Sequence, residues 1–198
     1  MLKVVGLSFL DWEPVSLEVE AGEIVCAQGE SGSGKSLLLR AIADLIPHTG
    51  EVYLHGDACS GILPTKWRRE VSFLAAEALW WEDRVGAHFL SEVSPERLEG
   101  LGLAGDCMDW PVSRLSMGER QRLGILRLLD RQPRVLLLDE PTSNLDARSS
   151  GAVESLLREY MEGSGACSIW VTHDEGQAER IGGRRFYMGG KRLEELAR

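Results

Sequence analysis

Two hydrophobic patterns occur along this chain, and they predict two kinds of β-strand. Between residues 3 and 20 apolar and polar positions alternate, most clearly over Val15–Glu20, which is typical of antiparallel strands with one exposed face. Shorter, mainly apolar segments predict core strands, and 135–138 is uniformly apolar, as a parallel strand covered on both faces must be. These core segments are 23–27, 71–75, 135–138 and 168–172.

Helical patterns lie between the apolar segments. Residues 37–46 read as a helix that ends before Pro47, and 152–161 repeat apolar residues at helical spacing. Strands that alternate with helices predict an α/β fold with a parallel sheet. From about 77 to 129 the pattern is helical and charged, so we expect an inserted helical subdomain over 77–126. Residues 1–76 and 127–198 would form the rest of a single domain, which spans 1–198.

Composition narrows the location and the partners. The 198 residues are 43% hydrophobic and carry a net charge of −9, which argues against a nucleic-acid partner. Four widely spaced cysteines form no C-x-x-C pair, which favours reduced thiols in the cytoplasm over a zinc site or disulfides. We also find no apolar run near the roughly 20 residues that span a bilayer and no signal-peptide pattern. We therefore expect membrane association only through a partner.

A glycine-rich stretch follows the apolar segment 23–27 and precedes the helix predicted over 37–46. It fits the phosphate-binding pattern G-x-x-x-x-G-K-[ST], called Walker A, with Gly29, Glu30, Ser31, Gly32, Ser33, Gly34, Lys35 and Ser36. The glycines let backbone N–H groups close around phosphate at a helix N-terminus. We expect Lys35 to reach the outer phosphates and Ser36 to bind Mg²⁺. The alternative is a chance match in a structural loop.

A carboxylate pair follows the uniformly apolar segment 135–138. Strand ends are where open α/β sheets place ligand-binding groups. We expect Asp139 to hold Mg²⁺ and Glu140 to orient and deprotonate an attacking water. The alternative is two exposed carboxylates in a turn.

Three further segments resemble motifs of the ATP-binding cassette (ABC) ATPases. Leu115–Arg122 resembles the signature loop, usually written L-S-G-G-Q. Val135–Asp146 resembles the Walker B and D-loop segment, and Trp170–Asp174 the switch-histidine segment. With Walker A, the motifs stand in family order and cover almost the whole chain. Within the family, Gly118–Asp146 is most similar to the iron-exporter-type FetA/YbbL group.

The resemblance implies a fold and a mechanism. The fold is a P-loop NTPase (RecA-like) core with an antiparallel β subdomain and an inserted helical signature subdomain. The mechanism is a homodimer that forms on ATP binding, in which Ser116 and backbone N–H groups around Gly118 of one copy face the ATP of the other. His173 would stabilise the γ-phosphate and the attacking water. The alternative is that His173 is a buried or surface histidine whose hydrogen bonds are satisfied within the fold. Asp146 would link the two sites, cap the following helix, or do both.

The chain departs from the family pattern at three places. Ala76 and Glu77 stand where the family has a glutamine after a strand, and Met117 replaces a signature glycine. Both changes put the rate of turnover in doubt. The aromatic residue that stacks on adenine is either Phe9 or Trp12, of which we favour Trp12; each could equally be packing.

The resemblance leaves three functions open. We favour the ATP-binding and hydrolysing subunit of an ABC transporter, docked on a transmembrane permease subunit at the inner face of the cell membrane. The alternatives are a soluble ABC ATPase outside transport, for example in iron–sulfur assembly, and a nucleotide-gated module with weak hydrolysis. Trp80 and Trp81 either pack inward or line a groove for the membrane partner.

Overall fold

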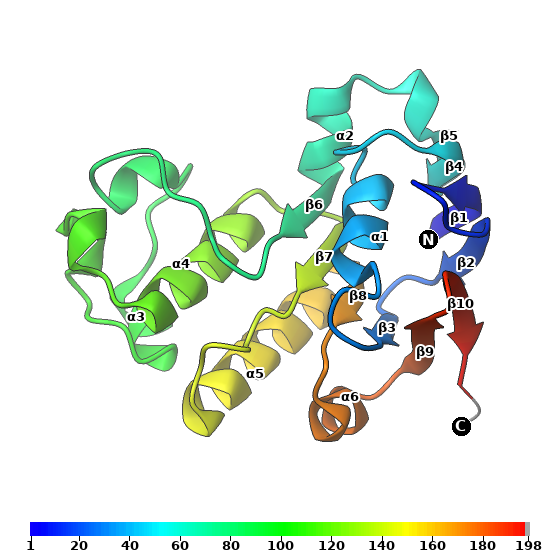
Figure 1. The fold of residues 1–198 in the computed structure, drawn as a ribbon. Coiled ribbons are helices and arrows are strands. Elements are labelled where there is room, and N and C mark those ends of the chain that lie inside the picture. Colours follow the sequence, from blue (N-terminus) through cyan, green and yellow to red (C-terminus); the bar gives the residue numbers. More distant parts are fainter. Residues whose placement is uncertain (197–198) are drawn as a thin grey trace.

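The computed structural model describes residues 1–196, and its centre is a six-stranded sheet (Figure 1). Five strands run parallel, and β10 returns antiparallel to β9 at one edge. In spatial order the strands are β10 (Arg192–Glu195), β9 (Arg184–Gly189), β3 (Ile24–Gln28), β8 (Cys167–Val171), β7 (Val135–Asp139) and β6 (Val71–Leu74). The predicted α/β fold with a parallel sheet is confirmed.

The register of the two central strands positions the chemistry. Every residue of β7 and β8 is buried, which explains why their sequences are almost uniformly apolar. Leu138 pairs with Trp170 and Asp139 with Val171. The loops that follow these neighbouring strands therefore start side by side at the carboxyl edge of the sheet.

A second, antiparallel sheet packs on the first. Its order is β2 (Val15–Val19), β1 (Leu2–Ser8), β4 (Thr49–Leu54) and β5 (Asp57–Ala58). The strand β2 alternates strictly between buried and exposed positions, as its sequence predicts. This sheet is the predicted antiparallel β subdomain.

The central sheet separates two hydrophobic clusters, and helices cover both of its faces. One cluster joins α1 to the antiparallel sheet, and the other joins α4, α5 and α6 to the opposite face. The helices are α1 (Lys35–Ile42), α2 (Pro64–Glu70), α3 (Pro95–Gly100), α4 (Met117–Asp130), α5 (Ala147–Ser164) and α6 (Glu175–Ile181). Because α1 ends at Ile42, it is shorter than the helix predicted up to Pro47.

Residues 77–116 contain less helix than the sequence pattern predicts. Only α3 and three short 3₁₀ turns interrupt the loops of this segment, which projects away from the sheet at the left of Figure 1. Several of its apolar side chains are nevertheless buried in the same cluster as α4, among them Leu98, Leu101 and Leu103. The helix-like spacing of apolar residues in this segment therefore reflects burial of side chains in loops, not a continuous helix. Across residues 1–196, no helix has both the length and the apolar character that a membrane span requires.

Candidate functional site

The glycine-rich loop joins β3 to α1 and depends on backbone angles that favour glycine. Gly29, Gly32 and Gly34 have φ values of 154°, 79° and 91°. A Cβ at Gly29 would lie 2.4 Å from the carbonyl oxygen of Met188 on the neighbouring strand β9. The loop conformation that the motif requires is therefore built into its glycines.

Lys35 reaches back over this loop from the first turn of α1. Its Nζ donates hydrogen bonds to the carbonyl oxygens of Gly29 and Glu30, both at 2.8 Å, and to Ser33 Oγ at 3.4 Å. The first turn of α1 contains no acidic residue. The ammonium group and the positive end of the helix dipole thus lie together, which suits a polyphosphate.

Asp139 lies at the end of β7 and is 5% exposed. Burial is the main cause that raises the pKa of this carboxyl group, and the charge of Glu140 raises it too. A hydrogen bond with Ser36 and the charges of Arg40 and Lys35 oppose the shift. A buried carboxylate and a hydroxyl group form an oxygen-only donor set, which is the chemistry that Mg²⁺ prefers. Asp139 and Ser36 therefore fit a magnesium ion.

Glu140 and His173 form a pair at the edge of the sheet. His173 Nδ1 lies 3.1 Å from Glu140 Oε1, and both side chains retain access to solvent. Glu140 has a φ of 46°, which is rare for a residue with a side chain, and its backbone N–H donates to Val171 O at 3.0 Å. This strained backbone is held by β8, the strand that leads to His173. The structure therefore brings together the two residues that the sequence predicted for catalysis.

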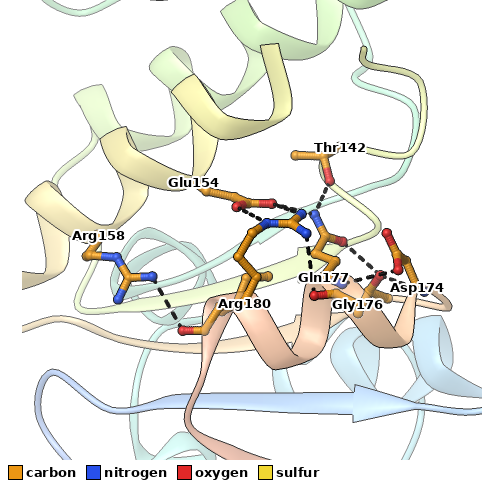
Figure 2. Close-up of polar contacts among 9 residues, drawn as sticks. Thr142, Glu154, Arg158, Asp174, Gly176, Gln177 and Arg180 are labelled. Carbon is orange, nitrogen blue, oxygen red and sulfur yellow. Dashed lines mark hydrogen bonds and ion pairs between the residues drawn. The ribbon is translucent and has the colours of Figure 1, made fainter. Parts of the chain in front are cut away.

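A polar network between α5 and α6 lies beside this pair. Figure 2 shows Gln177 and Arg180 directed from α6 toward Glu154 of α5, with Thr142 on the far side of the Gln177 amide. A groove of about 740 Å³ lies beside the network and is lined by Glu140 and His173 as well. Sequence reasoning missed these residues. The available signal was the spacing of Asp174 and Gln177, which is that of a helix N-cap and its third residue.

The signature segment begins α4 with a capping box. The Ser116 side chain accepts from the backbone N–H of Glu119, and the Glu119 carboxylate accepts from the N–H and hydroxyl of Ser116. Met117 is an ordinary first residue of the helix and is 62% exposed. Its side chain therefore requires no unusual backbone angle.

The signature segment also packs on the loop before α5. A Cβ at Gly118 would lie 3.3 Å from a methyl group of Leu145, so a side chain at position 118 would crowd this loop. Asp146 caps α5 by accepting from the N–H of Ser149 at 2.9 Å, which confirms its predicted capping role. In Figure 1 the start of α4, which Ser116 caps, lies apart from the glycine-rich loop between β3 and α1.

The two aromatic residues proposed for adenine stacking differ in their surroundings. Phe9 is 1% exposed and belongs to the hydrophobic core, so it presents no ring face to a ligand. Trp12 stacks on Phe9 with ring centroids 5.4 Å apart and contacts the glycine-rich loop at Gly34. Trp12 is 8% exposed and belongs to the same hydrophobic cluster, so little of either ring is exposed, and adenine stacking by Trp12 stays a prediction.

The segment after β6 contains no glutamine at the position where the family has one. Ala76 is half-buried and Glu77 is exposed. The two tryptophans that follow differ in exposure. The guanidinium of Arg127 lies 4.5 Å from the ring centroid of Trp80 and 4.7 Å from that of Trp81. Trp80 is half-buried, whereas Trp81 is 62% exposed and lines a groove of about 280 Å³.

Comparisons with known proteins agree with this geometry. A family model described as ABC transporter matches residues 12–143. The aliphatic sulfonates import ATP-binding protein SsuB of Pseudomonas putida is 36% identical over 179 residues, which cover 86% of this chain and 64% of that relative. The probable iron export ATP-binding protein FetA of Escherichia coli is 31% identical over 175 residues, covering 82% of this chain and 78% of FetA. The chain thus spans less than two thirds of the sulfonate relative.

Solved structures of ATP-binding cassette proteins have the same fold as this chain. A dimeric post-hydrolysis state of the ATP-binding cassette MJ0796 with ADP and Pi has a TM-score of 0.81 and 26% identity, and the match covers 100% of this chain and 99% of that one. An ATP-binding subunit of an ABC transporter with 22% identity has a TM-score of 0.84 over 97% of this chain and shares its fold. The predicted P-loop NTPase fold and the predicted family are confirmed: the chain belongs to the ABC transporter family and contains its ATP-binding domain.

Proposed function

We propose that this chain binds ATP with Mg²⁺ and hydrolyses it as the ATP-binding subunit of a membrane transporter. The observation that carries this proposal is the 3.1 Å contact between Glu140 and His173, one residue beyond the buried Asp139. A phosphate-binding loop alone would serve any nucleotide-binding protein. A carboxylate paired with a histidine beside it adds a group that can accept a proton from water.

The chain's own residues divide the reaction between binding and proton transfer. The backbone N–H groups of Gly29–Ser36 hold the phosphates, and Lys35 exchanges its loop carbonyl partners for phosphate oxygens. Ser36 and Asp139 would hold Mg²⁺, which neutralises phosphate charge when it is bound. Glu140 accepts a proton as the water oxygen bonds to the γ-phosphorus and the bond to ADP breaks. His173 orients Glu140 and contacts the γ-phosphate.

The site is completed by a second copy. Because the start of α4 lies apart from the glycine-rich loop of the same chain, Ser116 and Gly118 would contact ATP held in the loop of a partner. A head-to-tail dimer with two-fold symmetry satisfies both copies at once, with Asp146 at the interface. Loss of the γ-phosphate removes the contact, so hydrolysis opens the dimer.

A transmembrane permease subunit is the partner that this motion would drive. The exposed ring of Trp81 in the groove beside α4 supports a docking site there, since aromatic anchors are typical of binding hot spots. The protein would then act at the cytoplasmic face of the membrane. One similar protein is named for import and another for export, so direction and cargo belong to the membrane subunit.

Phosphate release under saturating Mg·ATP tests the proposal. Glu140→Gln should keep ATP binding, lose turnover by a factor of about 10²–10⁴, and shift the protein toward a dimer when ATP is added. Light scattering measures the dimer, and Glu175→Gln, on an exposed face of α6, is the matched control. Unchanged turnover in Glu140→Gln, or monomers at every ATP concentration, would contradict the mechanism.

A further inference from the structure

We propose that Gln177 is a positioning residue, whose buried amide joins the two loops that carry Glu140 and His173 and fixes the distance between them. The proposal deepens the proposed function and rests on it. Gln177 touches neither of the two residues and no part of the glycine-rich loop in the described contacts. Its effect on hydrolysis is therefore exerted through the loops.

Every hydrogen-bonding group of the Gln177 amide is used. Its Nε2 donates to Thr142 Oγ1 at 2.6 Å and to Glu154 Oε1 at 3.0 Å, and its Oε1 accepts from Thr172 Oγ1 at 2.8 Å. The side chain is 5% exposed. A buried amide with all three partners in place is rigid, and the loss of one partner leaves a buried polar group unsatisfied.

The partners of Gln177 lie next to the proposed catalytic pair in the sequence. Thr142 is two residues beyond Glu140, in the loop after β7, and Thr172 directly precedes His173, in the loop after β8. The bridge from Thr142 through Gln177 to Thr172 therefore joins both loops just where the pair is formed. Asp174 reinforces it, because its N–H donates to Thr172 Oγ1 at 3.1 Å while its carboxylate caps α6.

The orientation of the amide is set by an ion pair on its other side. Arg180 donates to both oxygens of Glu154, at 3.1 and 2.9 Å. Burial raises the pKa of the Glu154 carboxyl group, but the hydrogen bonds from Arg180 and Gln177 outweigh it, so the pKa is lowered overall. An ionised carboxylate can only accept, so the Gln177 NH₂ group must face Glu154 and its carbonyl oxygen must face Thr172.

This arrangement predicts a specific incompatibility. A glutamate at position 177 would place a second carboxylate against Glu154, and two carboxylates at hydrogen-bond distance repel each other. Exchanging the two residues restores one amide and one carboxylate at the same contact. In the exchanged pair, the glutamate at 177 accepts from the hydroxyl groups of Thr142 and Thr172.

The experiment compares Gln177→Glu, Glu154→Gln, the double variant and the isosteric Gln177→Met, with Glu175→Gln on the same helix as the control. We expect Gln177→Glu and Gln177→Met to lower kcat about 10- to 100-fold, since small displacements of reacting groups have effects of this size. The ATP dissociation constant, measured separately, should change less than about twofold because Gln177 does not touch the phosphate loop. The double variant should regain most of the lost kcat.

A second readout does not depend on hydrolysis. The ¹⁵N chemical shifts of the His173 ring report its contact with Glu140, and we expect them to change in Gln177→Met but not in Glu175→Gln. If the wild-type protein releases no phosphate, the proposed function is wrong, and the ring shifts still decide whether Gln177 positions His173. Unchanged ring shifts in Gln177→Met would overturn the inference. An unchanged kcat in folded Gln177→Met would also overturn it. A loss of ATP affinity as large as the loss of kcat would overturn it too.

Discussion

The indole ring of Trp12 lies directly against Gly34, so a Cβ atom at position 34 would be 2.9 Å from both Cζ2 and Nε1 of the ring. Gly34 is the N-cap of α1 and has a left-handed backbone conformation. The ring is also stacked on the buried Phe9, with an angle of 18° between the planes. Phe9 thus holds Trp12 at the start of the helix that follows the glycine-rich loop.

We predict that Trp12→Ala weakens ATP binding through the base and not through the phosphates. Stacking of a base on an aromatic side chain contributes about 1–3 kcal/mol, so the dissociation constant should rise about 5- to 150-fold. Tripolyphosphate, which has no base, should bind to Trp12→Ala and wild type with similar affinity. Calorimetric titrations with both ligands measure the difference.

Phe9→Leu is the matched control for this prediction, because it keeps an apolar core residue and leaves Trp12 in place. Phe9→Leu should lower the melting temperature, because Phe9 is almost fully buried, while its ATP dissociation constant stays close to that of wild type. An equal loss of affinity for ATP and tripolyphosphate in Trp12→Ala would show that the ring acts through the shape of the phosphate loop.

Two helical glycines should respond in opposite ways to alanine. A Cβ at Gly124 of α4 would lie 2.7 Å from the Cβ of Ala78, whereas Gly151 of α5 has no atom within 4 Å of the same position. Gly124→Ala should therefore lower the free energy of unfolding by about 1–3 kcal/mol through overpacking. Gly151→Ala should raise it by about 0.5–1 kcal/mol through helix propensity.

Urea titrations of the two variants measure these changes. Each variant is the control for the other, since both replace a glycine inside a helix by the same residue. A stabilised Gly124→Ala would mean that the loop carrying Ala78 moves away from α4 at little cost.

Some motifs could be recognised in the sequence because their residues are needed both for a backbone conformation and for binding a ligand. Gly29, Gly32 and Gly34 are glycines for a conformational reason, and Lys35 follows them for a chemical one. The same holds for Asp139 and Glu140, which follow a strand whose burial is evident from its apolar residues. Such positions allow the fold and the site to be predicted together.

Contacts between distant residues carry no such local signal. Gln177 and Thr142 are 35 positions apart, and neither the helix-cap spacing at Gln177 nor the motif that contains Thr142 indicates that their side chains meet. Phe9 and Trp12 are equally aromatic in the sequence, and only the folded structure shows that Trp12 is the one in contact with Gly34. The helix content of residues 77–116 was overpredicted for the same reason. Buried leucines in loops produce spacings that resemble those of a helix.

The four cysteines should be unreactive in the folded protein. All four are buried, and burial raises the pKa of Cys26, Cys59 and Cys167 from 9.0 to about 11. At about pH 8 this lowers the fraction of reactive thiolate about 100-fold relative to an exposed thiol. Ellman's reagent should therefore modify all four cysteines in concentrated guanidinium and none within minutes under native conditions.

The raised pKa values also make stability depend on pH. The folded state holds the thiol protons more tightly than the unfolded state, so this contribution to stability is complete below pH 9.0. It is lost as the pH rises through about 11. A rapid reaction of one thiol in the native protein would instead reveal local opening of the strand or turn that carries it.

Ala76→Gln should increase the rate of ATP hydrolysis. Ala76 is half-buried two residues beyond β6, where this chain lacks the polar side chain expected from its family, and the exposed Glu77 cannot supply a neutral amide. One added hydrogen bond to water or to a phosphate ligand contributes about 0.5–1.5 kcal/mol, which corresponds to a rate increase of about 2- to 10-fold. Steady-state phosphate release with saturating ATP measures it. Leu79→Gln, at an exposed position of the same loop, is the control and should leave the rate unchanged. If both variants behave like wild type, this chain orients its water without a residue at position 76, and Glu140 and His173 suffice.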